Sequence, residues 1–187
     1  MRTQSKYRVL VVRLGAMGDI LHALPAVTAL REAHPNWTID WVVEPKWRAL
    51  LAAEGSVERD TGAAAPMRPL VDNLHFAATK AWRKQPLSSG TRTELAALRK
   101  ALRAGQYDTV IDLQGAMRSA VVARMAGARR LIGEDAPRER AARLLFNERV
   151  KTHGAHVIEQ DVELVNAIAG DMLAPALPVL PVDKAAE

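Results

Sequence analysis

The 187-residue sequence contains no cysteine, few aromatic residues (4%) and no long apolar run. Without cysteine, thiol nucleophiles, cysteine-ligated zinc and disulfides are excluded. No apolar stretch approaches the roughly 20 residues that a membrane-spanning helix requires, and the opening MRTQSKYRVLVV lacks the cleavage site of a signal peptide. With 49% hydrophobic and 25% charged residues, the composition is that of a globular domain, and the absence of cysteine is compatible with a cytoplasmic protein.

Positive charge is concentrated in the middle of the chain. Residues 79–149 carry 15 basic and 7 acidic side chains, against a net charge of +5 for the whole sequence. A solvated helix surface and an anionic partner are both compatible with this excess. Nucleic acid is not expected as that partner, because aromatic residues are scarce and no recognition motif is present.

Segments with strand and helix patterns alternate along the sequence. β-branched, apolar segments predict strands at 8–14, 37–44, 73–79, 107–113 and 130–132. Helical spacing of apolar residues predicts helices from about Ile20 to Pro35 and at 46–54, 91–104, 117–125, 137–145 and 155–168. This alternation favours parallel strands joined by helical crossovers. The predicted fold is therefore a Rossmann-like three-layer α/β/α sandwich with a mainly parallel sheet.

Two segments lack these patterns. Residues 55–72 contain glycine, proline and a run of small residues, which indicates an irregular surface segment. From Pro175 the sequence reads APALPVLPVDKAAE, which is typical of a linker. We therefore expect one domain over 1–174 and a Pro-rich linker over 175–187.

Ligands of such sheets bind at the carboxyl ends of the strands, which selects the turns at 14–19 and 112–118 and the segment 79–84. Gly15 and Gly18 allow a ligand to approach the backbone closely, beside the free N–H groups that begin a helix. Asp19 either caps that helix or acts as a general base for a sugar hydroxyl. Asp112 either caps the next helix or pairs with an arginine, and Arg118 is placed to bind an anion.

A cluster of cations surrounds Trp82. Lys80, Arg83 and Lys84 either form an ordinary surface loop or bind a phosphorylated or carboxylated sugar. The five histidines show no metal-ligand spacing with carboxylates, so no metal site is expected.

The segment RVLVVRLGAMGDILHALPAVTALREAHPNWTIDWVVE resembles the opening of the type I lipopolysaccharide heptosyltransferases of glycosyltransferase family 9. The resemblance continues in AWRK (81–84), YDTVIDLQGAMRSA (107–120), PRERAARLLFNERV (137–150) and the H-x-V-E-like stretch from His156. Several motifs in the same order over nearly the whole chain make the resemblance specific.

The resemblance implies a two-domain GT-B architecture, of which this sequence covers only the first, acceptor-binding domain. The second domain, which binds the nucleotide-sugar donor, is absent, so we expect the chain to be inactive alone. The implied reaction is inverting transfer of heptose from ADP-L-glycero-D-manno-heptose to the Kdo residue of Kdo-lipid A, without cofactor or obligatory metal. The implied location is peripheral, at the cytoplasmic face of the inner membrane.

The resemblance also assigns roles to residues. Asp19 matches the proposed general base of the family. The cations that match acceptor-binding positions are Lys80, Arg83, Lys84, Arg118 and Arg138, with Trp82 beside them. Gly15, Ala16, Met17 and Gly18 are expected to contact substrate or phosphate through their backbone, supported by Asp112, Gln114 and Gly115.

The sequence departs from the family at three positions. Gly15 and Ala16 replace serines that family members often carry, and Ala81 stands where a relative has a cation. Two alternatives to the type I assignment therefore stay open. One is a heptosyltransferase of the same family with another acceptor, and the other is a non-catalytic module that binds anionic sugars or phosphates.

Overall fold

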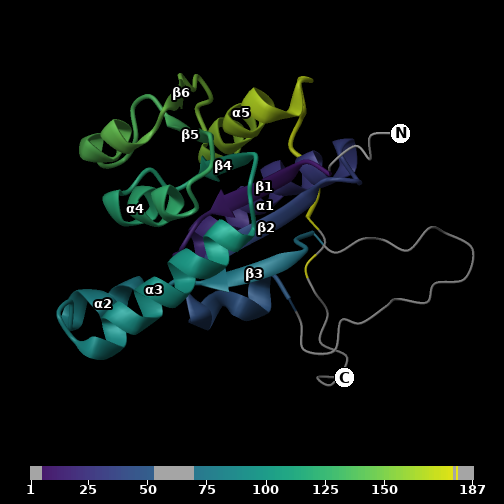
Figure 1. Cartoon of the computed structure of the whole chain (residues 1–187). Helices are drawn as coiled ribbons and strands as arrows, with labels where there is room; N and C mark the ends of the chain where they lie inside the picture. The colour runs from purple at the N-terminus through teal and green to yellow at the C-terminus, as the bar shows by residue number, and fades with distance from the viewer. Residues whose placement is uncertain (1–5, 53–69, 179, 181–187) are drawn as a thin grey trace, which may run out of the picture.

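A six-stranded parallel sheet forms the centre of the protein (Figure 1). The computed structural model describes residues 6–52, 70–178 and 180. Its strands are β1 (Arg8–Val12), β2 (Thr38–Val43), β3 (Asn73–Phe76), β4 (Thr109–Asp112), β5 (Arg130–Glu134) and β6 (Glu148–Val150). They lie in the order β3-β2-β1-β4-β5-β6, and every neighbouring pair is parallel. The chain therefore changes direction across the sheet between β1 and β4.

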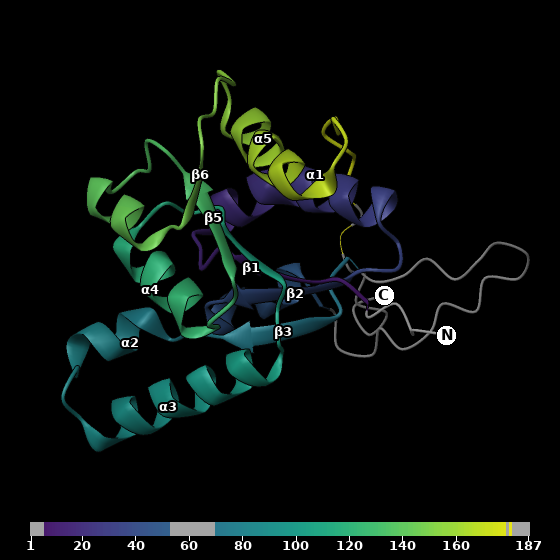
Figure 2. The ribbon, with the colours of Figure 1, turned by 45° about the horizontal axis from the view of Figure 1, so that its top comes forward.

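Helices cover both faces of this sheet (Figure 2). The α-helices are α1 (Met17–Ala33), α2 (Thr79–Lys84), α3 (Ser89–Ala104), α4 (Met117–Met125) and α5 (Val157–Ala169). There are also two 3-10 helices among the described residues. The first, η1 (Pro45–Leu50), follows β2, and the second, η2 (Arg140–Leu145), precedes β6. Helices α1 and α5 pack on one face, and α3 and α4 pack on the other. The predicted three-layer α/β/α sandwich is confirmed.

The central strand explains why the sequence adopts this arrangement. Val9 and Val11 face the core beneath α1 and α5, whereas Leu10 and Val12 face the core beneath α3 and α4. All four side chains are fully buried. A strand that is apolar on both faces needs a helix layer on each side, which a parallel sheet with crossover helices supplies.

Three local expectations need correction. The helices expected at 46–54 and 137–145 are the 3-10 helices η1 and η2. Only Ala142 is fully buried in them, and Trp47, Leu50 and Leu145 pack partly against the core, so each anchors little apolar surface with which to stabilise a longer α-helix. Strand β6 was not expected, because it is a three-residue edge strand without a run of apolar residues.

The chain after α5 returns along α1. Leu173 packs against the core and its N–H donates to Asn166 Oδ1 (2.9 Å). The Ala176 N–H donates to the Pro25 carbonyl (3.2 Å). The described part of the expected linker, 175–178 and 180, forms no helix or strand. The rest of that segment, 179 and 181–187, lies outside the described residues. So does most of the irregular segment expected at 55–72. Among the described residues, no helix is both long and apolar enough to cross a bilayer.

Candidate functional site at the carboxyl ends of β1 and β4

The turns after β1 and β4 lie together at the point where the strand order reverses. The Leu14 N–H, just beyond β1, donates to Oε1 of the buried Gln114, just beyond β4 (2.8 Å). This bond ties the 14–19 turn to the 112–118 turn, so two of the three sequence-selected places form one site. In doubly wound sheets this position binds ligands.

Glycine is required at Gly15 by both conformation and space. Its φ is +147°, and a Cβ there would lie 2.6 Å from Nε1 of Trp47 on η1. Gly18 differs, because a Cβ there would meet no atom within 4 Å. Ala16, Met17 and Gly18 are exposed. The start of α1 therefore presents an open backbone surface above a tightly packed turn.

Asp19 caps α1 and is also partly accessible. Its Oδ2 accepts from the Ala16 N–H (3.0 Å), so that backbone group is engaged within the chain. Its Oδ1 lies 3.9 Å from Nη2 of Arg13, and 37% of the side chain is exposed. The capping role considered from the sequence is thus present, and it holds a carboxylate in a fixed orientation at the open end of α1.

Arg13 and Asp161 belong to this site, although sequence reasoning missed both. Arg13 follows β1 directly, is 5% exposed and lies 3.8 Å from Oδ1 of Asp161 on α5. The pKa of Asp161 is raised to about 7, chiefly by burial; Arg13 opposes the rise, and the charges of Glu134 and Asp19 add to it. The only sequence signal for Arg13 was a cation directly after an apolar strand. For Asp161 the sequence contains no such signal, because its partner Arg13 lies about 150 residues away in the chain.

Asp112 shapes the second turn. Its fully buried carboxylate accepts from the Gln114 N–H (2.8 Å), the Gly115 N–H (3.1 Å) and the Ser119 hydroxyl (2.9 Å). Burial nevertheless raises its pKa to about 6, against the lowering effect of these donors. Asp112 thus fixes the path of the backbone from β4 into α4, as a supporting residue would.

Arg138 reaches the same turn through backbone packing. Gly115 has a φ of +63°, and a Cβ there would lie 3.0 Å from the Arg138 nitrogen. Glu139 completes the junction, because its N–H donates to the Gly115 carbonyl and its Oε2 accepts from the Met117 N–H. Arg118 and Arg138 are exposed, and neither forms an ion pair within the described part of the chain.

The cations of α2 share this edge of the sheet but form a separate group. Thr79 donates to Oε1 of the buried Glu44, which fixes the start of α2 beside the end of β2. Lys80, Arg83 and Lys84 are exposed, and no ion pair or hydrogen bond between described residues joins them to either turn.

Trp82 makes contacts within the chain that the sequence did not indicate, and its expected part in acceptor binding stays a prediction. Its indole N–H donates to Glu94 Oε2 on α3 (2.6 Å), and its ring packs against the core beneath α3 and α4. This contact holds α2 on α3 and leaves the indole N–H engaged within the chain.

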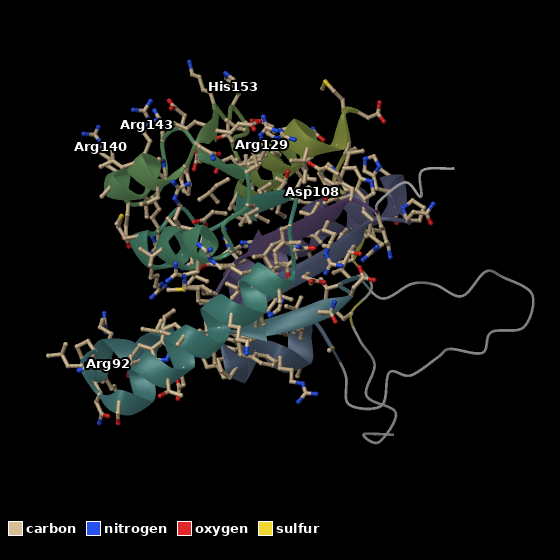
Figure 3. The ribbon with its side chains drawn as sticks, in the orientation of Figure 1. Arg92, Asp108, Arg129, Arg140, Arg143 and His153 are labelled. Atoms are coloured by element: carbon tan, nitrogen blue, oxygen red, sulfur yellow. The ribbon has the colours of Figure 1, made fainter. Side chains whose placement is uncertain are left out.

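A cavity of about 670 Å³ lies between α3 and α4, near the amino ends of the strands. It is named here the basic groove and is lined by Arg99, Arg103, Val121, Arg124, Met125, Gly127, Ala128 and Leu145. Its three arginines form no ion pair with an acidic side chain among the residues described. Figure 3 shows Arg140 and Arg143 projecting outward from the neighbouring η2.

No group of three or more His, Asp or Glu within 6–52, 70–178 and 180 is placed to hold a metal ion.

Comparison with known proteins identifies relatives of this chain. Residues 95–187 match the family model described as glycosyltransferase family 9 (heptosyltransferase). The chain is 37% identical over 162 residues to lipopolysaccharide heptosyltransferase 1 of Escherichia coli strain K12, which covers 84% of this chain and 46% of the relative. It is 31% identical over 160 residues to the protein of that name from Pseudomonas aeruginosa, covering 84% and 41%.

Solved structures agree with these matches. The structure of E. coli heptosyltransferase WaaC with ADP-2-deoxy-2-fluoro heptose superposes with a TM-score of 0.73 at 31% identity, covering 87% of this chain and 48% of that one. A glycosyl transferase family 9 structure from Veillonella parvula shares the fold, with a TM-score of 0.70 at 17% identity, over 96% of this chain and 46% of that one. The chain thus spans about half the length of the relatives it matches.

Proposed function

Because this chain belongs to glycosyltransferase family 9, we propose that it forms the acceptor-binding half of a lipopolysaccharide heptosyltransferase. In the proposed reaction, heptose passes from ADP-heptose to the Kdo residue of Kdo-lipid A. A second half, such as the relatives carry beyond the matched region, would bind the nucleotide sugar. Residues 1–174 would hold the acceptor, and the Pro-rich segment from Pro175 would join the two halves.

Asp19 is the proposed general base. It would remove the proton from the acceptor hydroxyl while that oxygen forms a bond to the anomeric carbon of heptose, and the bond from that carbon to the ADP oxygen would break. The observation that carries the proposal is the position of Asp19. It is an oriented, 37%-exposed carboxylate at the strand-order reversal, beside an open backbone surface. A base within reach of the substrate proton is the first geometric requirement of this chemistry.

Asp19→Asn separates catalysis from capping. The asparagine oxygen can still accept from the Ala16 N–H, so the cap and the fold are kept, but the amide cannot take a proton. In a two-domain protein that contains this chain, transfer should fall by about 100-fold or more while the unfolding midpoint stays close to that of the parent. Near-normal transfer by this variant would leave Asp19 with a capping role alone.

The exposed cations at this edge are the proposed contacts for the acidic groups of the acceptor. Lys80, Arg83, Lys84, Arg118 and Arg138 supply guanidinium and ammonium donors without acidic partners of their own among the described residues. Reversing charge at Arg83 and Lys84 should weaken binding of Kdo-lipid A in a titration. The matched control reverses two exposed cations elsewhere, Arg149 on β6 and Lys151, and should bind normally.

We further propose that the protein works at the cytoplasmic face of the inner membrane, in peripheral contact with it, because its proposed acceptor is anchored in lipid. The basic groove, near the opposite ends of the strands from the acceptor site, is the proposed second surface for this contact, since it joins three arginines without acidic partners in the described structure to apolar side chains. We also propose transfer without an obligatory metal ion. Treatment of the two-domain protein with EDTA tests that part and should leave transfer unchanged.

A further inference from the structure

The guanidinium of Arg13 is shared between two carboxylates on different helices. Nη2 lies 3.9 Å from Asp19 on α1, and Nη1 lies 3.8 Å from Asp161 on α5. Both separations exceed the roughly 2.7–2.9 Å of a hydrogen-bonded ion pair. The buried cation is therefore attracted from two sides and closes fully on neither carboxylate.

The burial of Asp161 is unfavourable for the stability of the folded protein. Its side chain is 3% exposed, and its Oδ2 is buried without a hydrogen-bond partner among the described residues, as is Nε of Arg13. The charged groups that face this pair are Asp19 on α1, Asp112 on β4 and Glu134 on β5, and all three are acidic. A buried carboxylate with so few donors costs stability, and its presence in a native protein calls for an explanation.

We propose that Asp161, acting through Arg13, is a positioning residue for the base Asp19. By holding the guanidinium back, Asp161 keeps Oδ1 of Asp19 free to accept the proton of the acceptor hydroxyl, while the Ala16 N–H fixes the other oxygen. Without the charge on Asp161, as in the asparagine variant or in the protonated form that predominates below about pH 7, Arg13 would close on Asp19 as a direct ion pair. Asp19 would then be a weaker base with one oxygen engaged. This inference rests on the proposed function, in which Asp19 takes the proton.

The geometric test uses this chain alone and needs no activity. In a crystal structure of the Asp161→Asn variant, an Arg13 Nη atom should lie about 2.8 Å from an Asp19 oxygen, instead of 3.9 Å. The control is Glu163→Gln on the same helix, whose carboxylate accepts from the His153 N–H and does not face Arg13. It should leave the Arg13–Asp19 separation unchanged. An unchanged separation in Asp161→Asn overturns the inference.

The kinetic test uses a two-domain protein. Asp161→Asn should lower kcat about tenfold, a fraction of the roughly 100- to 10,000-fold that a general base contributes, with KM for the acceptor unchanged. The acid limb of the pH–kcat profile should move down by about one pH unit, because Arg13 then favours the charged form of the base. If kcat falls but the acid limb of the pH–kcat profile stays where it is in the parent, Asp161 has only a structural role, and the inference is overturned.

The two proposals fail in distinguishable ways. Near-normal transfer by the Asp19→Asn variant refutes the proposal that Asp19 is the general base, whatever the structure of the Asp161→Asn variant shows. Inactive Asp19→Asn together with parental kcat, KM and pH profile for Asp161→Asn refutes only the positioning role of Asp161.

Discussion

Replacing Asp161 with asparagine should stabilise the protein above neutral pH. Burial raises the pKa of Asp161 to about 7 from an ordinary value of 3.8. The folded protein thus binds this proton more tightly than the unfolded chain does, and protonation favours folding. The stabilisation is complete below about pH 4 and is lost as the pH rises through 7.

The magnitude follows from the two pKa values. The gap between about 7 and 3.8 corresponds to roughly 4 kcal/mol, at about 1.4 kcal/mol for each pH unit. Asparagine stays neutral at every pH and has nearly the same shape as protonated aspartate. The Asp161→Asn variant should therefore match the parent near pH 4 and exceed its free energy of unfolding by up to about 4 kcal/mol at pH 8.

Urea unfolding followed by circular dichroism between pH 4 and 8.5 measures this difference directly. The Glu163→Gln control changes a carboxylate on the same helix that does not face Arg13, and it should not show this gain in stability at high pH. A constant deficit in the Asp161→Asn variant at both pH 4 and pH 8 would refute the reasoning. It would mean that attraction to Arg13 outweighs the cost of burying the Asp161 charge.

Two further predictions concern the first turn and the basic groove. Gly15→Ala should cost about 1–3 kcal/mol of stability in thermal unfolding, because of the positive φ and the contact with Trp47, whereas Gly18→Ala inside α1 should be neutral or slightly stabilising. Equal losses of stability in the Gly15→Ala and Gly18→Ala variants would refute the argument that only Gly15 is constrained by conformation and packing. Reversing the charge of the three arginines of the basic groove should reduce co-sedimentation with vesicles of anionic phospholipid and leave co-sedimentation with neutral vesicles unchanged. Unchanged binding to anionic vesicles would remove the groove from the proposed membrane contact.

The fold was predictable from the sequence because its central elements have strong local signals. The helix expected at 117–125 has the observed bounds of α4, and the helix expected to end at 168 is α5, which ends at Ala169. Prediction failed where an element depends on its neighbours. Strand β6 exists because Ile132 of β5 pairs with Glu148, and no pattern within three residues encodes that pairing.

The site was predictable only in part, for a similar reason. Gly15, Asp19 and Asp112 stand at strand ends, where a local pattern reveals them. The Arg13–Asp161 pair depends on the packing of α5 on α1, which joins residues far apart in the sequence. The contact of Trp82 with Glu94 was not predicted, because it joins two successive helices, and the expected part of Trp82 in acceptor binding stays a prediction.

The hydrogen bond from Ala176 to Pro25 has a practical consequence for shortened versions of this protein. A truncation after Gly170, where the last helix ends, would remove Leu173 from the edge of the core and leave the Asn166 side chain without its backbone partner. The smallest segment that preserves the packing around α1 therefore extends to Ala176. Expression trials that stop at the end of secondary structure would yield a less soluble product than those ending six residues later.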